Sequence, residues 1–124
     1  MSEKKLILVI DDDPDILDSL KAILNAEGFE TATAMSGQEG IEAMVKKPDL
    51  VLCDMMMERI DSGSKVAQEI RKKNAHVPVY LLSSIGTATA TNVDINDLGF
   101  NGVFQKPVNP DLLISSVKKA LGMK

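Results

Sequence analysis

Short apolar runs alternate with amphipathic stretches along this chain. Three of the runs are long and continuous, and two further strand candidates are weaker. Continuous apolar runs, unlike alternating ones, are typical of strands that are buried on both faces of a parallel sheet. The long runs are Leu6–Ile10, Leu50–Cys53 and Val77–Leu82, and the weaker candidates are Phe29–Ala34 and Gly102–Phe104.

Apolar residues recur at helical spacing between these runs. The first such stretch is expected to begin at Asp13 or Pro14 and to end at Gly28. The second is expected to begin after Ser36, where Glu39 would complete a capping box. The predicted apolar stripes are Ile16, Leu17, Leu20, Ile23 and Leu24, then Ile41, Met44 and Val45, then Val66, Ala67 and Ile70, and last Leu112, Leu113, Val117 and Leu121.

The order of these elements indicates the fold class. One more helix is expected within Thr87–Leu98, although threonine has poor helix propensity. The chain then consists of a strand–helix unit repeated five times, which predicts an α/β fold with a parallel sheet and helices on both faces. No linker or internal repeat interrupts the pattern, so residues 1–124 are expected to form one domain.

Composition and charge narrow the function classes. A chain of 124 residues, 44% apolar and 26% charged, has the make-up of an ordinary globular domain. Its net charge is −4 and no Lys/Arg cluster forms a basic stripe, so nucleic acid is not expected to bind directly. The single cysteine, Cys53, is expected to be a buried thiol in a reducing compartment. The apolar run before Asp11 is too short for a signal peptide or a membrane span, which predicts a cytoplasmic location.

Chemically useful residues follow the strand candidates. Ligands of open parallel sheets bind beyond the carboxyl ends of the strands, near a switch in strand order. Carboxylates gathered there would repel one another by on the order of 4 kcal/mol per pair at about 4 Å. A hard divalent cation such as Mg²⁺ would offset that repulsion. The residues are Asp11, Asp12 and Asp13 after the first run, Asp54 after the third, Ser83 and Ser84 after the fourth, and Lys106 after the fifth.

Each of these residues also has an ordinary explanation. The acidic triplet could simply open a helix, where the macrodipole favours Asp. Asp54 could be a turn residue, Ser83 a cap, and Lys106 a solvated loop lysine. Because all of these residues fall at successive strand ends, a shared functional site explains them better than four unrelated structural roles.

The strand ends belong to four longer motifs: LILVIDDDPDI (residues 6–16), PDLVLCDMMM (48–57), VPVYLLSS (77–84) and FQKP (104–107). With these motifs in this order and at these separations, the chain resembles the response-regulator receiver family from Leu6 to Leu121. The resemblance implies a flavodoxin-like, doubly wound fold. Its five-stranded parallel sheet would have the order 2-1-3-4-5, with five helices on the two faces.

The resemblance also implies a role for each candidate site residue. Asp54 takes the place of the phosphoacceptor, Ser83 that of the switch hydroxyl, and Lys106 that of the lysine that pairs with a phosphoryl oxygen. The implied cofactor is Mg²⁺, and within the acidic pair Asp11 and Asp12 it is Asp12 that is expected to contact the ion directly. The full ligand set is Asp11, Asp12, Asp54 and the backbone carbonyl of Met56.

The implied function is that of a phosphoacceptor switch in a two-component system. A sensor histidine kinase or phosphotransfer protein donates the phosphoryl group, and hydrolysis of the acyl phosphate resets the switch. Phosphorylation changes the face formed by the fourth helix, the fifth strand and the fifth helix, which acts on a downstream effector domain or protein. Such a protein assists its own phosphorylation without being a dedicated enzyme, and no membrane partner is expected. Phosphorylation-dependent homodimerisation, and whether the chain is a stand-alone regulator or part of a longer protein, stay open.

The sequence departs from the family pattern in two places. The family usually has Met-Pro-Gly and then Asp-Gly after the phosphoacceptor, whereas this chain has Met-Glu-Arg-Ile-Asp-Ser at residues 57–62. The family often has an aromatic switch residue three positions before the lysine, where this chain has Val103 and then Phe104. If the alignment of this chain with the family needs a gap between Ser83 and Lys106, a wrong position for that gap would by itself place Val103 at the switch position.

Three other functions are weighed against this one. A phosphatase of the haloacid-dehalogenase class would use Asp11 as nucleophile and Asp13 as its partner, but it would need a later acidic loop and a cap domain. A pseudo-receiver would act as a protein-interaction module without phosphorylation. A flavin-binding domain would need a phosphate-cradling loop after the first strand, where an acidic triplet would repel the cofactor.

Overall fold

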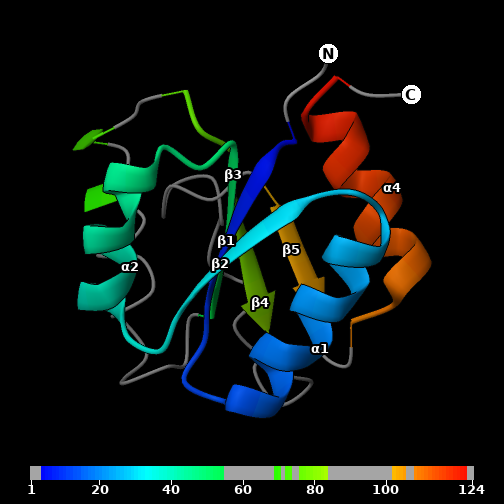
Figure 1. Cartoon of the computed structure of the whole chain (residues 1–124), viewed down its shortest axis with the longest axis horizontal. Helices are drawn as coiled ribbons and strands as arrows, with labels where there is room; N and C mark the ends of the chain where they lie inside the picture. The colour runs from blue at the N-terminus through cyan, green and yellow to red at the C-terminus, as the bar shows by residue number, and fades with distance from the viewer. Residues whose placement is uncertain are drawn as a thin grey trace, which may run out of the picture.

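The computed structural model describes residues 4–54, 69–70, 72–73, 76–83, 102–105 and 108–122, with the side chains of residues 83, 103 and 105 left out. Within this part, a twisted parallel sheet lies between helices on its two faces (Figure 1). The strands are β1 (Leu6–Ile10), β2 (Glu30–Ala34), β3 (Leu50–Asp54), β4 (Val79–Ser83) and β5 (Gly102–Gln105), and the helices are α1 (Pro14–Ala26), α2 (Gly37–Ala43), the 3-10 helix η1 (Met44–Lys46) and α4 (Pro110–Ala120).

The strand order is β2-β1-β3-β4-β5, the order that the resemblance implied. Every strand pair is parallel, and the last residue of β1, Ile10, pairs with Ala34 of β2 and with Cys53 of β3. The carboxyl ends of these three strands therefore lie at one level. The predicted class, an α/β fold with a parallel sheet, is confirmed.

Two hydrophobic cores form, one on each face of the sheet. Side chains alternate between the faces of a strand, so β1 contributes Leu8 and Ile10 to one core and Ile7 and Val9 to the other. The first core lies beneath α2, and the second lies beneath α1 and α4 (Figure 1). Full burial of one such side chain contributes about 1.5–3 kcal/mol. The continuous apolar runs of β1 and β3 thus fit their central position, with both faces covered.

The helix starts agree closely with the sequence. Asp13 caps α1 by accepting a hydrogen bond from the Asp15 N–H, and Pro14 occupies the first helical position. Ser36 caps α2 by accepting from the Glu39 N–H at 3.1 Å. Only this hydrogen bond of the predicted capping box is formed. In place of the second one, to the Ser36 N–H, the Glu39 carboxylate accepts from the Met35 N–H at 3.4 Å, one residue before the cap.

Two residues assigned to buried stripes are exposed instead. Val45 has 81% of its surface exposed because α2 gives way at Met44 to a 3-10 helix, whose tighter turn buries Met44 and directs Val45 outward. Leu112 is 57% exposed, whereas Leu113 and Val117 form the buried side of α4.

The number of helices stays a prediction. The described residues include three α-helices and one 3-10 helix. Glu69, Ile70, Lys72 and Lys73 are also helical, and Ile70 is fully buried, as its place in the third predicted stripe requires. Thr87–Leu98, where a further helix was expected, lies outside the described residues. None of the described helices is long and apolar enough to cross a membrane.

Candidate metal centre

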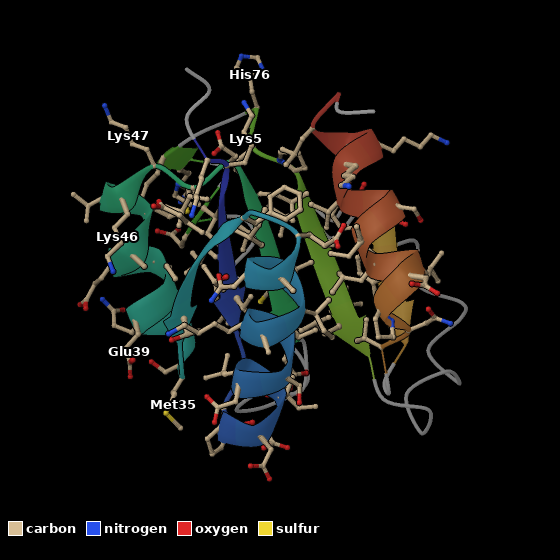
Figure 2. The ribbon with its side chains drawn as sticks, turned by 45° about the vertical axis from the view of Figure 1, so that its right-hand side comes forward. Lys5, Met35, Glu39, Lys46, Lys47 and His76 are labelled. Atoms are coloured by element: carbon tan, nitrogen blue, oxygen red, sulfur yellow. The ribbon has the colours of Figure 1, made fainter. Side chains whose placement is uncertain are left out.

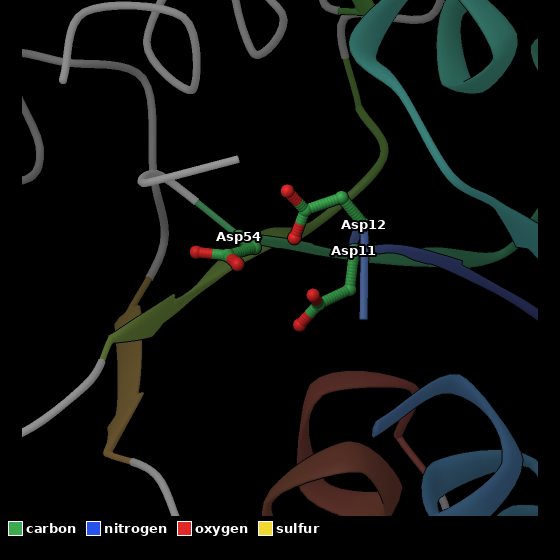
Figure 3. A group of neighbouring side chains, drawn as sticks. All are labelled: Asp11, Asp12 and Asp54. Atoms are coloured by element: carbon green, nitrogen blue, oxygen red, sulfur yellow. The ribbon is translucent and has the colours of Figure 1, made fainter. Parts of the chain in front are cut away.

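Two central strands bring three carboxylates together. Asp11 and Asp12 directly follow β1, and Asp54 is the last residue of β3. Because Ile10 pairs with Cys53, the residues that follow each of them stand side by side at the carboxyl edge of the sheet. Figure 3 shows the side chains of Asp11, Asp12 and Asp54 gathered at these strand ends, with those of Asp11 and Asp12 extending toward the side of Asp54. The predicted convergence of Asp11, Asp12 and Asp54 is confirmed.

The cluster is compact and mostly hidden from solvent. Each of the three residues offers one carboxylate oxygen such that all three oxygens lie within 4.8 Å of one another. Asp11 is fully buried and Asp54 is 5% exposed, whereas Asp12 is exposed. The site is therefore open to solvent on the Asp12 side and closed beneath.

Hydrogen bonds fix the position of Asp11. Its backbone N–H donates to the carbonyl oxygen of Ala34 at the end of β2, at 3.0 Å. Its carboxylate Oδ1 accepts from the Asp13 N–H at 2.9 Å. The residue is thus held between the neighbouring strand and the turn that leads into α1. Sequence reasoning did not find Ala34, because a backbone acceptor has no residue-type signature.

The negative charge of the cluster affects the pKa of the neighbouring Cys53 thiol. This thiol is fully buried next to Asp54 in the sequence, as predicted. Burial, together with the smaller effect of the negative charges of Asp54 and Asp11, raises the pKa of Cys53 from 9.0 to about 12. The thiol therefore stays protonated near neutral pH and is a poor metal ligand.

The donor set fits a hard divalent cation. All three side chains offer carboxylate oxygens, which are the ligands that Mg²⁺ and Ca²⁺ prefer. Neither imidazole nor thiolate, the usual ligands of structural zinc, belongs to this trio. A divalent cation would also offset the repulsion among three negative charges at this spacing.

Other predicted site residues fall at or beyond the limits of the described chain. Ser83 ends β4 beside the site, one residue after Leu82, which pairs with Asp54. Its side chain lies outside the described set, and so do Met56, Lys106 and the loop at 57–62. The roles of Met56, Ser83 and Lys106 stay predictions.

Phe104 is a core residue. It is 5% exposed and belongs to the core beneath α1 and α4. Its ring lies 5.4 Å from that of Tyr80, centroid to centroid, with the ring planes tilted by 31°. The aromatic residue that follows Val103 thus packs in the core on this face.

Comparisons with known proteins agree on one family. The sequence profile described as "Response regulator receiver domain" matches residues 7–118. The chain is 34% identical over 116 residues to the transcriptional regulatory protein GlrR of Escherichia coli, covering 93% of this chain and 26% of that protein. It is 33% identical over 122 residues to the DNA-binding response regulator MtrA of Mycolicibacterium smegmatis, covering 95% of this chain and 51% of that one. The chain therefore spans about a quarter to a half of these relatives.

Solved structures give the same family. A response regulator receiver domain protein from Clostridium thermocellum superposes with a TM-score of 0.84 at 30% identity, covering 95% of this chain and 94% of that one. The receiver domain of NtrX from Brucella abortus superposes with a TM-score of 0.83 at 32% identity, covering 95% of this chain and 99% of that one.

Proposed function

Since the chain belongs to the response regulator receiver family, we propose that it is a two-component signalling switch that takes up a phosphoryl group on Asp54. The observation that carries the proposal is the meeting of three carboxylates at the ends of β1 and β3. We assign residues 1–124 to one receiver domain on the same grounds.

Magnesium is the cofactor that this site suits best. Asp11, Asp12, Asp54 and the Met56 carbonyl would hold the ion, three of them through the carboxylates that already converge. When bound, Mg²⁺ supplies positive charge next to the phosphoryl oxygens. The exposed Asp12 lies on the open side of the site, where an ion would enter.

The chain's own residues account for the transfer. The Asp54 carboxylate is the nucleophile: an oxygen–phosphorus bond forms on Asp54 while the nitrogen–phosphorus bond of a partner's phosphohistidine breaks, and the released histidine nitrogen takes up a proton from water. Lys106 pairs with a phosphoryl oxygen, and the Ser83 hydroxyl donates a hydrogen bond to another. Water later cleaves the acyl phosphate, which resets the switch. The protein thus assists its own modification and is not a dedicated enzyme.

Output and partners follow from the family. We propose a sensor histidine kinase or phosphotransfer protein as donor, and an effector domain or protein as recipient of the signal. Inward movement of Ser83 and Lys106 toward the phosphoryl group would change the face formed by the predicted helix at 87–98, β5 and α4. Two relatives are named as transcriptional or DNA-binding regulators, which supports a cytoplasmic site of action.

Phosphorylation with a small donor tests the proposal. Wild type and Asp54→Asn are incubated with acetyl phosphate and Mg²⁺, and intact masses are recorded with and without EDTA. We expect a single labile phosphoryl adduct that needs Mg²⁺ and is absent from the variant. Asp18→Asn, which removes an exposed carboxylate of α1 that does not belong to the cluster, is the matched control and should be phosphorylated normally.

Each other outcome points to one alternative. No adduct from a wild type that binds Mg²⁺ would indicate a pseudo-receiver. An adduct that survives Asp54→Asn and disappears in Asp11→Asn would indicate the phosphatase-type nucleophile.

A further inference from the structure

A glycine lets α2 lie directly on the last residue of β1. Gly40 is buried within α2, and its N–H donates to the Ser36 carbonyl at 3.0 Å. A Cβ atom at position 40 would lie 2.8 Å from Cγ1 of Ile10, and Cδ1 of the same side chain would be closer still. Ile10 is fully buried in the core beneath α2, so it has little room to move aside. A side chain at this position would therefore force Ile10, α2 or both to shift.

The residue that would be pushed is adjacent to the acidic cluster. Ile10 is followed directly by Asp11, whose buried carboxylate is one of the three that converge. The contact between α2 and Ile10 therefore bears on the position of a candidate metal ligand one peptide bond away.

A second connection runs from α2 to the same aspartate. The Asp11 N–H donates to the carbonyl of Ala34, and only Met35 and Ser36 separate that residue from α2. Both linker residues are tied to the helix, because Met35 donates to the Glu39 carboxylate and Ser36 accepts from the Glu39 N–H. Figure 2 shows Met35 and Glu39 together at this junction. A displacement of α2 would reach Asp11 through β2 as well as through Ile10.

We propose that Gly40 is a positioning residue for the cation site. By allowing close approach of α2 to Ile10, it fixes the end of β1 and hence the place of the Asp11 carboxylate relative to Asp54. The inference rests on the proposed function in one respect, namely that Asp11 is a ligand of the ion.

Magnesium affinity of the folded protein tests the proposal. The dissociation constant for MgCl₂ is measured by titration calorimetry in wild type and Gly40→Ala, and urea unfolding without Mg²⁺ gives the stability of each. We expect Gly40→Ala to bind Mg²⁺ about tenfold more weakly or worse, as when a group that orients a metal ligand is lost.

A matched glycine separates positioning from general destabilisation. Gly28 has φ +92° and nothing within 4 Å of its Cβ position, so Gly28→Ala strains the turn after α1 without pushing on the site. This control should lose stability and keep the wild-type Mg²⁺ affinity. A Gly40→Ala protein that is destabilised but binds Mg²⁺ as tightly as wild type would show that Gly40 serves packing alone, and the proposal would be wrong.

A second pair of variants, I10V and I10V/G40A, tests the proposal if Gly40→Ala does not fold. Ile10→Val lacks Cδ1, the atom nearest the added methyl, so the overlap in I10V/G40A is smaller than in G40A. I10V/G40A should still bind Mg²⁺ more weakly than I10V, because Cγ1 remains in the way. Equal affinities overturn the proposal. A wild type that binds no Mg²⁺ overturns the proposed function and this inference with it.

Discussion

At the scale of single residues, the burial of Cys53 beside two carboxylates should make the free energy of unfolding fall with rising pH in the alkaline range. Burial, then Asp54 and Asp11, raise the pKa of Cys53 from 9.0 to about 12, so the unfolded chain releases the thiol proton first. The contribution of this thiol to stability is complete below pH 9 and is lost as the pH rises toward 12. Between these limits the free energy of unfolding should fall more steeply in wild type than in Cys53→Ala, by up to about 1.4 kcal/mol per pH unit. Urea titrations at pH 8, 9, 10 and 11 measure both slopes, and parallel slopes would contradict the prediction.

The same scale holds a prediction for Asp12. This residue is the exposed member of three carboxylates whose oxygens lie within 4.8 Å, so without a cation its charge destabilises the folded state. Asp12→Asn should raise the free energy of unfolding without Mg²⁺ by about 1 kcal/mol, the value for well-solvated charges near 4 Å. In saturating Mg²⁺ the sign should reverse, because wild type then gains more from binding. Urea unfolding with and without Mg²⁺ checks both signs, and the exposed Asp18→Asn on α1 should shift equally under the two conditions.

At the scale of elements, neighbouring leucines on α4 have opposite environments. Leu113 is fully buried beneath the helix, and Leu112 is 57% exposed. Leu113→Ala should lower the free energy of unfolding by about 2–5 kcal/mol because it leaves a cavity in the core. Leu112→Ala should stay within about 0.5 kcal/mol of wild type, as surface substitutions do. Chemical denaturation of the two variants measures this difference, and similar losses would mean that both leucines are buried in solution.

The elements also show what the sequence could and could not predict. The strands were predicted well because continuous apolar runs have few other uses in a chain of this length. Leu112 and Val45 were misassigned because apolar character alone does not tell which way a residue faces near a helix end. The 3-10 turn at Met44–Lys46 shifts that direction, and no residue type announces it. The Glu39 carboxylate was expected to accept from the Ser36 N–H at the start of α2 and accepts from the Met35 N–H instead. The two N–H groups are one residue apart, and the sequence does not distinguish them.

At the scale of the molecule, the site was predictable because parallel topology places strand ends together. Asp11, Asp12 and Asp54 could be assigned to one edge once the first and third strands were taken as neighbours, and the sheet order bears this out. Gly40 and the Ala34 carbonyl could not be found in this way. Their importance depends on how closely α2 approaches β1, which is a property of packing and not of residue type.

The site lies at the ends of two strands that contribute to both cores, and this predicts how Mg²⁺ affects unfolding. The central strands β1 and β3 contribute to both cores, so an ion at their ends should stabilise both faces as one cooperative unit. Tyr80 is the chain's single tyrosine, no tryptophan is present, and its ring lies against the core beneath α1 and α4, so its fluorescence reports on that face. Far-UV circular dichroism reports on all elements together. At a Mg²⁺ concentration of about one hundred times the dissociation constant, both signals should shift equally, by about 2.7 kcal/mol in unfolding free energy. A shift in the dichroism that the tyrosine signal does not share would mean that the two faces unfold separately, and that the ion stabilises only the face beneath α2.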